Sequence, residues 1–275
     1  MNNNLSLFRK QGFLVLENFN SAEACEELMK RGEWLVNGFE PEGHPSVFQT
    51  SNQAVTTDDY FLHSGDKIRF FFEKDAFDEQ GNARQDIFRS LNKIGHALHD
   101  LDPVFSKFSR SLQMKQLAHE LELDDWVIIQ SMLIFKHARI GGNVDIHQDS
   151  TFLFTEPDSC IGFWFALEDA TVENGCLWAK PGGHATPLHA TFRRKPGGGT
   201  EMVSVTEESY DMTGMIPLEV KKGTCIVLHG LLPHYSLPNT SGKSRQAYAI
   251  HTVNRHAHYP DTNWLQRDMS MVSGF

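Results

Sequence analysis

The sequence predicts a mainly β-protein with flanking helices. From Trp126 onward, short runs rich in β-branched and aromatic residues alternate with turn clusters of Gly, Pro, Asn and Asp, which is typical of a β-sandwich or barrel. Before Trp126, two segments carry apolar residues at helical spacing. The sequence contains no repeat or long linker. We therefore expect one domain over 1–275, with a helical cap at about 1–125 and a β-core at about 126–255.

The first predicted helix lies in FNSAEACEELMKRGEWL. Asn20 is followed three positions later by Glu23, which matches the capping box, where two side chains bond backbone N–H groups of the first helical turn. Apolar residues then recur near the helical period, at Cys25, Leu28 and Trp34. These features predict an amphipathic helix.

The second predicted helix begins at Pro103, in PVFSKFSRSLQMKQLAHEL. A proline is well tolerated at the first position of a helix, because its missing N–H would have no intrahelical partner there. The apolar residues fall near one stripe, at Val104, Phe108, Leu112, Leu117 and Leu121. The pattern predicts a single helix over this segment.

Short strands are predicted in the second half of the chain. Their runs are WVIIQSMLIFKH, CIGFWFALEDA, GCLWAK, GTCIVLHG and RQAYAIHTVN. Asn174 and Gly175 are expected to form a hairpin turn between two of these strands. The segment RRKPGGGTE, at 193–201, is expected to be a mobile insertion between strands, because it combines glycines with charged residues.

Composition limits the possible partners and compartments. The formal net charge of -10 gives no basic face for nucleic acid, and no apolar run approaches the length of a membrane span. A small molecule is the expected partner, and the oligomeric state stays open. The four cysteines form no C-x-x-C pair and the first residues do not resemble a secretory signal. We therefore expect a reducing, cytoplasmic setting.

His147 and Asp149 stand two positions apart in VDIHQDSTF, which reads as a strand running into a polar turn. Side chains at i and i+2 of a strand point to the same face, so the pair could reach one ion. A third ligand would complete the two-histidine, one-carboxylate triad that holds non-haem Fe(II). The segment LHGLLPHYSLPN offers His229 and His234. With fourteen histidines in the chain, an H-x-D pair also arises by chance.

A turn argument favours His234 over His229 as the third ligand. If the strand that contains His234 turns at LPNTSG and returns as RQAYAIH, position 234 pairs with Arg245. If His229 took this place instead, Pro238 would fall inside the partner strand. His229 is therefore interpreted as a polar residue at a strand end. Arg245 offers a planar fork that suits a cosubstrate carboxylate. The alternative is a solvated strand residue beside Lys243.

Two other classes of protein stay open from these residues. A cupin-like protein that binds a metal and a ligand without turnover would share the barrel and the histidines but would have no use for Arg245. A zinc hydrolase could use the same three candidate ligands with an activated water, yet the sequence has no H-E-x-x-H helix. Turnover of 2-oxoglutarate and the preferred metal would separate these alternatives.

Several segments, in order, resemble the phytanoyl-CoA dioxygenase family of Fe(II)- and 2-oxoglutarate-dependent oxygenases. They are GFLVLENFNSAEACEEL, IHQDSTFLFTEP, WFALEDATVENGCLWAKPGGH and LHGLLPHYSLPNTSGKSRQAYAIH. Two more, DYFLHSGDKIRFFFEKDAFDEQGN and NKIGHALHDLDPVF, are similar to one branch of that family. The resemblance covers almost the whole chain. It implies a double-stranded β-helix, the jelly-roll core of cupin-like proteins, with flanking helices.

The resemblance also implies the cofactors and the iron ligands. His147, Asp149 and His234 match the positions that bind Fe(II), and Arg245 matches the partner of the 2-oxoglutarate C5 carboxylate. Ser236 would add a hydroxyl to that carboxylate. Oxygen and 2-oxoglutarate would be consumed, with release of succinate and CO2. Because halogenating relatives replace the carboxylate ligand by a small residue, Asp149 favours hydroxylation or a related oxidation.

Three further cosubstrate residues rest on the resemblance alone. They are Lys93, from a predicted helix in NKIGHAL, Met132 in QSM, and Trp164 in GFWFALEDA. Without the resemblance, Lys93 reads as a surface lysine, Met132 as a core residue and Trp164 as packing between the sheets. All three stay predictions at this stage.

The remaining histidines are not expected to bind metal. The sequence has PGGH where the family commonly has P-G-S-H, and His184 is retained but not needed as a ligand. His251, His256 and His258 are expected to be solvated residues on or beyond the last strand. We therefore predict three ligands and no more.

The substrate is predicted to be a small or medium free metabolite rather than a long-chain acyl-CoA. A CoA thioester carries several phosphate charges and needs a basic approach to the pocket. The cationic candidates are few, with Lys67 and Arg69 on one face of DKIRFFFEK and RRK at 193–195. Phe70 and Phe72 on the opposite face are predicted to be core residues. Acyl-CoA 2-hydroxylation stays the alternative.

Overall fold

The computed structural model describes residues 3–39, 58–73, 76–77, 85–86 and 88–275. Parts of the predicted helical cap, at 40–57, 74–75, 78–84 and 87, lie outside the described residues. None of the helices in the described ranges is long and apolar enough to cross a membrane. These helices are α1 (Asn3–Gln11), α2 (Ala22–Asn37), α3 (Asp59–Leu62), α4 (Leu98–Leu101), α5 (Pro103–Ser109) and α6 (Leu112–Glu120).

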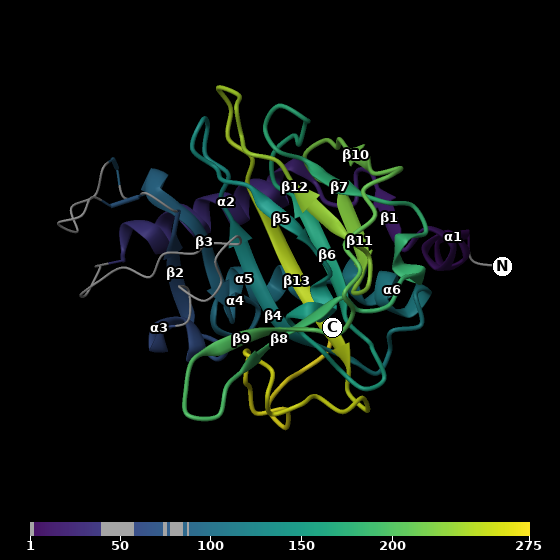
Figure 1. Cartoon of the computed structure of the whole chain (residues 1–275). Coiled ribbons are helices and arrows are strands. Elements are labelled where there is room, and N and C mark those ends of the chain that lie inside the picture. Colours follow the sequence, from purple (N-terminus) through teal and green to yellow (C-terminus); the bar gives the residue numbers. More distant parts are fainter. Residues whose placement is uncertain (1–2, 40–57, 74–75, 78–84, 87) are drawn as a thin grey trace.

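Antiparallel strands of the described chain form a seven-stranded sheet, a four-stranded sheet and a short hairpin (Figure 1). The seven-stranded sheet contains, in spatial order, β1 (Phe13–Leu16), β11 (Cys225–His229), β6 (Ile161–Ala166), β13 (Ala247–Asn254), β4 (Trp126–Ile134), β3 (Leu91–His96) and β2 (Ile68–Phe72). The four-stranded sheet contains β10 (Ile216–Leu218), β7 (Leu177–Ala179), β12 (His234–Ser236) and β5 (Val144–His147). The hairpin pairs β8 (Ala190–Arg194) with β9 (Thr200–Ser204).

Each face of the seven-stranded sheet buries a different set of side chains. Its outer face packs against α2, α5 and α6, and Figure 1 shows α2 behind the strands. Its inner face packs against the four-stranded sheet, for example through Trp164 and Ala249, which meet Leu177 and Ala179 in one apolar cluster. This arrangement of two facing antiparallel sheets with outer helices confirms the predicted jelly-roll fold.

The first predicted helix is present, but its start and its buried face differ from the prediction. Ser21, not Asn20, is the N-cap, and its hydroxyl accepts from the N–H of Ala24. Trp34 is 60% exposed, because Gly32 and Val36 occupy the buried stripe four and eight positions after Leu28. The Arg31 guanidinium instead covers the Trp34 ring at 3.9 Å.

The second predicted helix is two helices, α5 and α6. The break falls at Arg110 and Ser111, where the Ser111 hydroxyl accepts from the N–H of Met114 and caps a new helix. Because the break changes the helical phase, Leu112 is 71% exposed, whereas Leu117 and Leu121 are buried. The Ser111 cap therefore divides one apolar pattern into two helices.

The five predicted runs of strand residues contain β4, β6, β7, β11 and β13, as expected. The predicted cap also contributes strands, because β1, β2 and β3 belong to the seven-stranded sheet. The 193–201 segment lies between strands as expected, and its two ends belong to the paired strands β8 and β9, which residues 195–199 connect. Asn174 and Gly175 lie between β6 and β7, but these strands belong to different sheets, so the predicted hairpin is wrong. One-domain organisation stays a prediction.

Small residues on the inner face leave space between the two sheets. Gly162 on β6 and Ala249 on β13 both line a cavity of about 580 Å³. The wall opposite them includes Val144 on β5 and Leu177 on β7. The four cysteines are elsewhere in the packed interior, each buried and free. The cavity is the place where the polar residues singled out in the sequence come together.

Candidate active site

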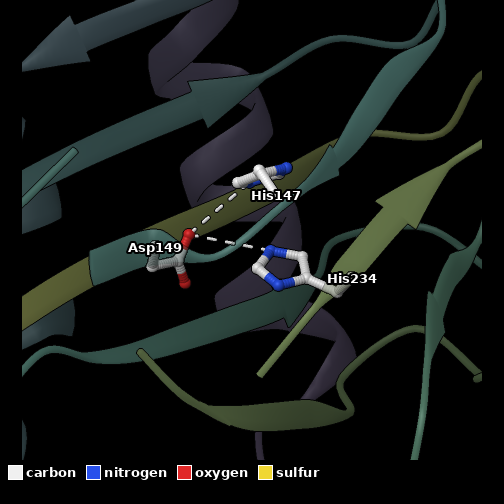
Figure 2. Close-up of side chains that lie close together, drawn as sticks. All are labelled: His147, Asp149 and His234. Carbon is white, nitrogen blue, oxygen red and sulfur yellow. Dashed lines mark ion pairs between the residues drawn. The ribbon is translucent and has the colours of Figure 1, made fainter. Parts of the chain in front are cut away.

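Three side chains place their ligand atoms within 4.8 Å of one another at the wall of the cavity: His147, Asp149 and His234. The Nε2 atoms of both histidines lie 3.6 Å from Asp149 Oδ1 (Figure 2). His147 ends β5 and His234 begins β12, and the two residues are directly paired across the antiparallel strands. Cross-strand pairing thus joins residues 87 positions apart in the sequence.

The approach of Asp149 has a different cause from the predicted strand alternation. The strand ends at His147, and Asp149 opens the 3-10 turn Asp149–Thr151. Its carbonyl accepts from the N–H groups of Phe152 and Leu153. The turn is also tied to the loop before β12, because the Ser150 N–H donates to the Gly230 carbonyl at 3.0 Å. A turn, not a shared strand face, therefore brings Asp149 to the histidines.

Backbone carbonyls orient both imidazoles. His147 Nδ1 lies 2.8 Å from the Asp145 carbonyl, and His234 Nδ1 lies 2.9 Å from the Leu232 carbonyl. A carbonyl only accepts, so each Nδ1 carries the proton and each Nε2 presents a lone pair toward Asp149 Oδ1. This tautomer is the one that a metal-binding histidine needs. The histidines thus fit a metal ion at the cluster.

The electrostatics of the cluster favour an anionic carboxylate. Burial alone would raise the pKa of Asp149, but the surrounding imidazoles, His251 above all, hold it well below its usual value. Burial lowers the pKa of His234 to about 4. At neutral pH, a negatively charged oxygen and an unprotonated imidazole nitrogen are therefore both available to a cation.

His229 and His184 lie outside this cluster. His229 ends β11, and its Nδ1 accepts from the Leu231 N–H at 3.1 Å. The His184 ring stands 5.1 Å from the His229 ring, and its Nε2 lies 3.1 Å from the Arg9 carbonyl. The structure brings His234, rather than His229, to His147.

The hairpin predicted to pair position 234 with Arg245 is wrong. His234 pairs with His147 on β5 and with Ala179 on β7, whereas Arg245 precedes β13 in the other sheet. The connecting segment crosses between the sheets and is held by Asn239, whose amide donates to the Lys136 carbonyl. The prediction failed because a local turn argument assumes that consecutive strands belong to one sheet.

Arg245 nevertheless reaches the cavity, where its side chain is 2% exposed. Its guanidinium carbon lies 5.3 Å above the Trp164 ring, and Nη2 donates to the Ser236 hydroxyl at 3.4 Å. Nε and Nη1 have no hydrogen-bond partner among the described residues. Burial lowers the pKa of Arg245 only to about 10, so it stays cationic at neutral pH. Such a group calls for an anion.

The other predicted cosubstrate residues also line the cavity, but Lys93 differs in setting from the prediction. Lys93 lies on strand β3 rather than on a helix and is 6% exposed, so the reading of it as a surface lysine is wrong. Burial lowers its pKa to about 7. Met132 pairs with Gly95 and Ala249 on neighbouring strands. Ser236 donates to the Gly175 carbonyl at 2.9 Å, so its hydroxyl accepts from Arg245.

His251 is the site residue that the sequence reasoning missed. It was expected to be solvated, yet it is 7% exposed and its Nε2 lies 3.4 Å from Asp149 Oδ2. The alternation Ala247, Ala249, His251 places it on the inner face of the sheet, and this signal was present in the sequence. His256 and His258, beyond the strand, are exposed as expected.

Aromatic side chains line another part of the cavity wall. Phe152 makes an edge contact with His147 at 5.7 Å between ring centroids and with Phe192 at 5.6 Å. Trp264 also lines the cavity. Phe70 and Phe72 belong to the apolar core, as predicted. Several aromatic rings therefore bound this part of the cavity.

Of the basic residues considered for a CoA substrate, Arg69, Arg193 and Arg194 are engaged in local contacts, whereas Lys67 and Lys195 are exposed. Arg69 covers the Tyr60 ring at 4.5 Å, and Lys67 precedes β2 rather than sharing a strand face with it. Arg193 pairs with Glu201 at 3.1 Å, and Arg194 donates to the carbonyl of Trp264 at 2.9 Å. The three arginine side chains are therefore already engaged within the protein.

Solved structures share the fold of this chain. The epimerase SnoN, in a crystal structure in complex with Fe3+, alpha ketoglutarate and nogalamycin RO, matches with a TM-score of 0.66 and 14% identity, covering 96% of this chain and 88% of that chain. AviO1 from Streptomyces viridochromogenes Tue57 matches with a TM-score of 0.62 and 20% identity, covering 94% of this chain and 96% of that one.

Curated relatives match at much higher identity and over nearly their full lengths. A phytanoyl-CoA dioxygenase of Arabidopsis thaliana is 44% identical, covering 96% of this chain and 92% of the relative. The phytanoyl-CoA dioxygenase domain-containing protein 1 of Bos taurus is also 44% identical, covering 95% and 93%. The family described as phytanoyl-CoA dioxygenase (PhyH) matches residues 8–247. The chain belongs to the phytanoyl-CoA dioxygenase family.

Proposed function

We propose that the protein is an Fe(II)- and 2-oxoglutarate-dependent dioxygenase. The observation that carries the proposal is the presence, in one cavity, of a two-histidine, one-carboxylate cluster and a buried arginine with unpaired donors. The cluster fits a cation, and the arginine fits a carboxylate. The cluster alone would indicate only a metal, and the arginine alone would indicate only an anion. Together they indicate an iron and a keto acid.

The proposed roles follow from these contacts. His147, Asp149 and His234 hold iron, Arg245 binds the distal carboxylate of 2-oxoglutarate, and Lys93 lines the same cavity beside the cosubstrate. Iron, 2-oxoglutarate and O2 together supply an oxidant that hydroxylates a C–H bond, with succinate and CO2 as coproducts. The chain's own part is to neutralise charge, orient both molecules and exclude water from the cavity.

The proposed substrate is a small or medium metabolite without a CoA group. A cavity of about 580 Å³ falls in the usual range for small-molecule sites, and the cosubstrate occupies part of it. Ring side chains line much of the remainder, and Arg193 and Arg194 are engaged in local contacts. Acyl-CoA 2-hydroxylation is the second candidate, because relatives carry the name phytanoyl-CoA dioxygenase.

Succinate formation tests the proposal directly. Purified protein with Fe(II), O2 and 2-oxoglutarate should release succinate, and a metabolite extract should raise the rate and yield a product with one oxygen from ¹⁸O2. A metal- and ligand-binding protein without turnover would bind 2-oxoglutarate and release no succinate. Oxidation without oxygen insertion would contradict hydroxylation, which matters because SnoN, a structural neighbour, is an epimerase.

A comparison of thioesters with free acids tests the substrate class. Coupled hydroxylation of a long-chain acyl-CoA, lost when Arg193, Arg194 and Lys195 are all replaced by glutamine, would overturn the preference for a CoA-free metabolite. Turnover of a free metabolite that survives the same triple replacement would support it. The triple variant is a suitable probe because none of these three residues lines the cavity or belongs to the histidine cluster.

A further inference from the structure

The two oxygens of Asp149 face different partners. Oδ1 lies 3.6 Å from the Nε2 atoms of His147 and His234. Oδ2 lies 3.4 Å from Nε2 of His251, which is on β13 in the other sheet. His251 does not belong to the three-residue cluster whose ligand atoms lie within 4.8 Å of one another. It therefore contacts a candidate ligand without being one.

One oxygen of Asp149 and one ring nitrogen of His251 are buried without an aligned hydrogen-bond partner in the described part of the chain. Asp149 Oδ2 has no aligned hydrogen-bond donor among the described residues, and His251 Nδ1 has no partner there either. An unpaired buried N–H costs more than an unpaired ring lone pair, so a single ring proton belongs on Nε2, where the carboxylate accepts it. If the His251 ring carries a second proton, on Nδ1, the Nε2–H donor is still present. His251 thus presents an N–H to Oδ2 in either form.

A glycine makes room for this contact. Gly162 on β6 is directly opposite His251 in the sheet. A Cβ at Gly162 would lie 3.0 Å from Asp149 Oδ2 and 3.4 Å from His251 Cδ2. Because contacts as short as 3.0 Å force a neighbour to move, any larger residue would push the carboxylate or the imidazole away. The absence of a side chain at Gly162 therefore allows the Asp149 carboxylate and the His251 imidazole to approach each other.

We propose that His251 is a positioning residue that holds Asp149 with Oδ1 toward the metal. The inference rests on the proposed function, since it requires an ion at the cluster. A donor to the second oxygen fixes the rotation of the carboxylate, so that it binds through one oxygen and leaves positions for 2-oxoglutarate and O2. His251 acts through Asp149, and it does so from the opposite sheet.

Metal affinity measured with and without the N–H donor tests this role. We expect His251→Leu to weaken Co(II) binding by about 10- to 100-fold, as for other partners of metal ligands. His251→Gln should recover most of that affinity, because its amide N–H reaches close to the position of Nε2. Thr252→Val, a buried neighbour on the same strand that donates to the Ile161 carbonyl, is the matched control and should bind as the wild type does.

The outcomes separate this inference from the proposed function. Thermal unfolding of each variant and the visible band of its anaerobic Fe(II)–2-oxoglutarate complex are measured beside the Co(II) titration. A folded His251→Leu variant with wild-type affinity and band would overturn the inference alone. Equal weakness of His251→Leu and His251→Gln would overturn it too, because packing rather than the donor would matter. A wild-type protein that binds no metal would overturn both.

Discussion

Nη2 of Arg245 donates to the hydroxyl of Ser236 at 3.4 Å, although the two residues belong to segments of different sheets. Ser236 lies on β12, and Arg245 precedes β13. Because Ser236 also donates its own proton to the Gly175 carbonyl, its lone pairs orient the guanidinium. The contact joins the sheets at the cavity wall, and it leaves Nε and Nη1 of Arg245 for a ligand.

Arg245→Ala should raise the 2-oxoglutarate requirement by roughly thirty-fold or more, since losing a charge-assisted carboxylate partner costs about 2–5 kcal/mol. Binding of Fe(II) should be largely unaffected, because Arg245 is outside the metal cluster. The measurement is a 2-oxoglutarate titration of the anaerobic Fe(II) protein. Arg255→Ala, at an exposed arginine, is the control. An unchanged requirement in Arg245→Ala would place the anchor elsewhere.

Replacing any of the three candidate ligands should abolish the Fe(II)–2-oxoglutarate charge-transfer band. His147→Ala, Asp149→Ala and His234→Ala each remove one of only three protein donors in the cluster found among the described residues. His229→Ala is the matched control, because His229 is also a partly buried histidine at the end of a strand. Loss of the band in His229→Ala with retention in His234→Ala would reverse the assignment.

Lys93 should make stability depend on pH. Burial lowers its pKa from 10.5 to about 7, so between these values the unfolded chain binds a proton that the folded protein lacks. The contribution of Lys93 to the free energy of unfolding should therefore rise with pH in that window, by up to about 1.4 kcal/mol per pH unit, and level off below pH 7. Denaturant unfolding without added cosubstrate measures it.

The contribution of Lys93 is isolated by comparison with Lys93→Met, whose stability should rise less steeply in this window. A smaller rise should remain, because burial also lowers the pKa of Lys136, to about 6. Lys107→Met, at an exposed lysine on α5, should retain the full rise. If the wild type and Lys93→Met show parallel stability curves between pH 7 and 10, then Lys93 keeps its ordinary pKa in the folded protein. That result would contradict the burial argument without touching the metal site.

Gly162→Ala should weaken metal binding while leaving the fold intact. The added Cβ would lie 3.0 Å from Asp149 Oδ2, and the carboxylate would have to move. Gly242→Ala is the control, because a Cβ there would meet nothing within 4 Å. Co(II) titration of both variants decides the matter, and equal affinities would show that the Asp149 carboxylate tolerates a methyl group at this position.

The sequence alone determined the features that depend on local pattern. Alternating β-branched and aromatic runs located β4, β6, β7, β11 and β13, because strand alternation is a property of consecutive residues. The H-x-D pair and the choice of His234 over His229 also came from local spacing and turn chemistry. The reason given for His234 was nevertheless wrong, since its partner is His147 rather than Arg245.

Only the tertiary structure decided which strands meet and which faces are buried. Lys93 is buried because β3 is enclosed between β2 and β4, and nothing in NKIGHAL reveals those neighbours. His251 lies against Asp149 because β13 pairs with β6 at Gly162, a position 89 residues earlier. Pairing between distant strands is a property of the whole chain, since it is set by the register and burial of all strands together.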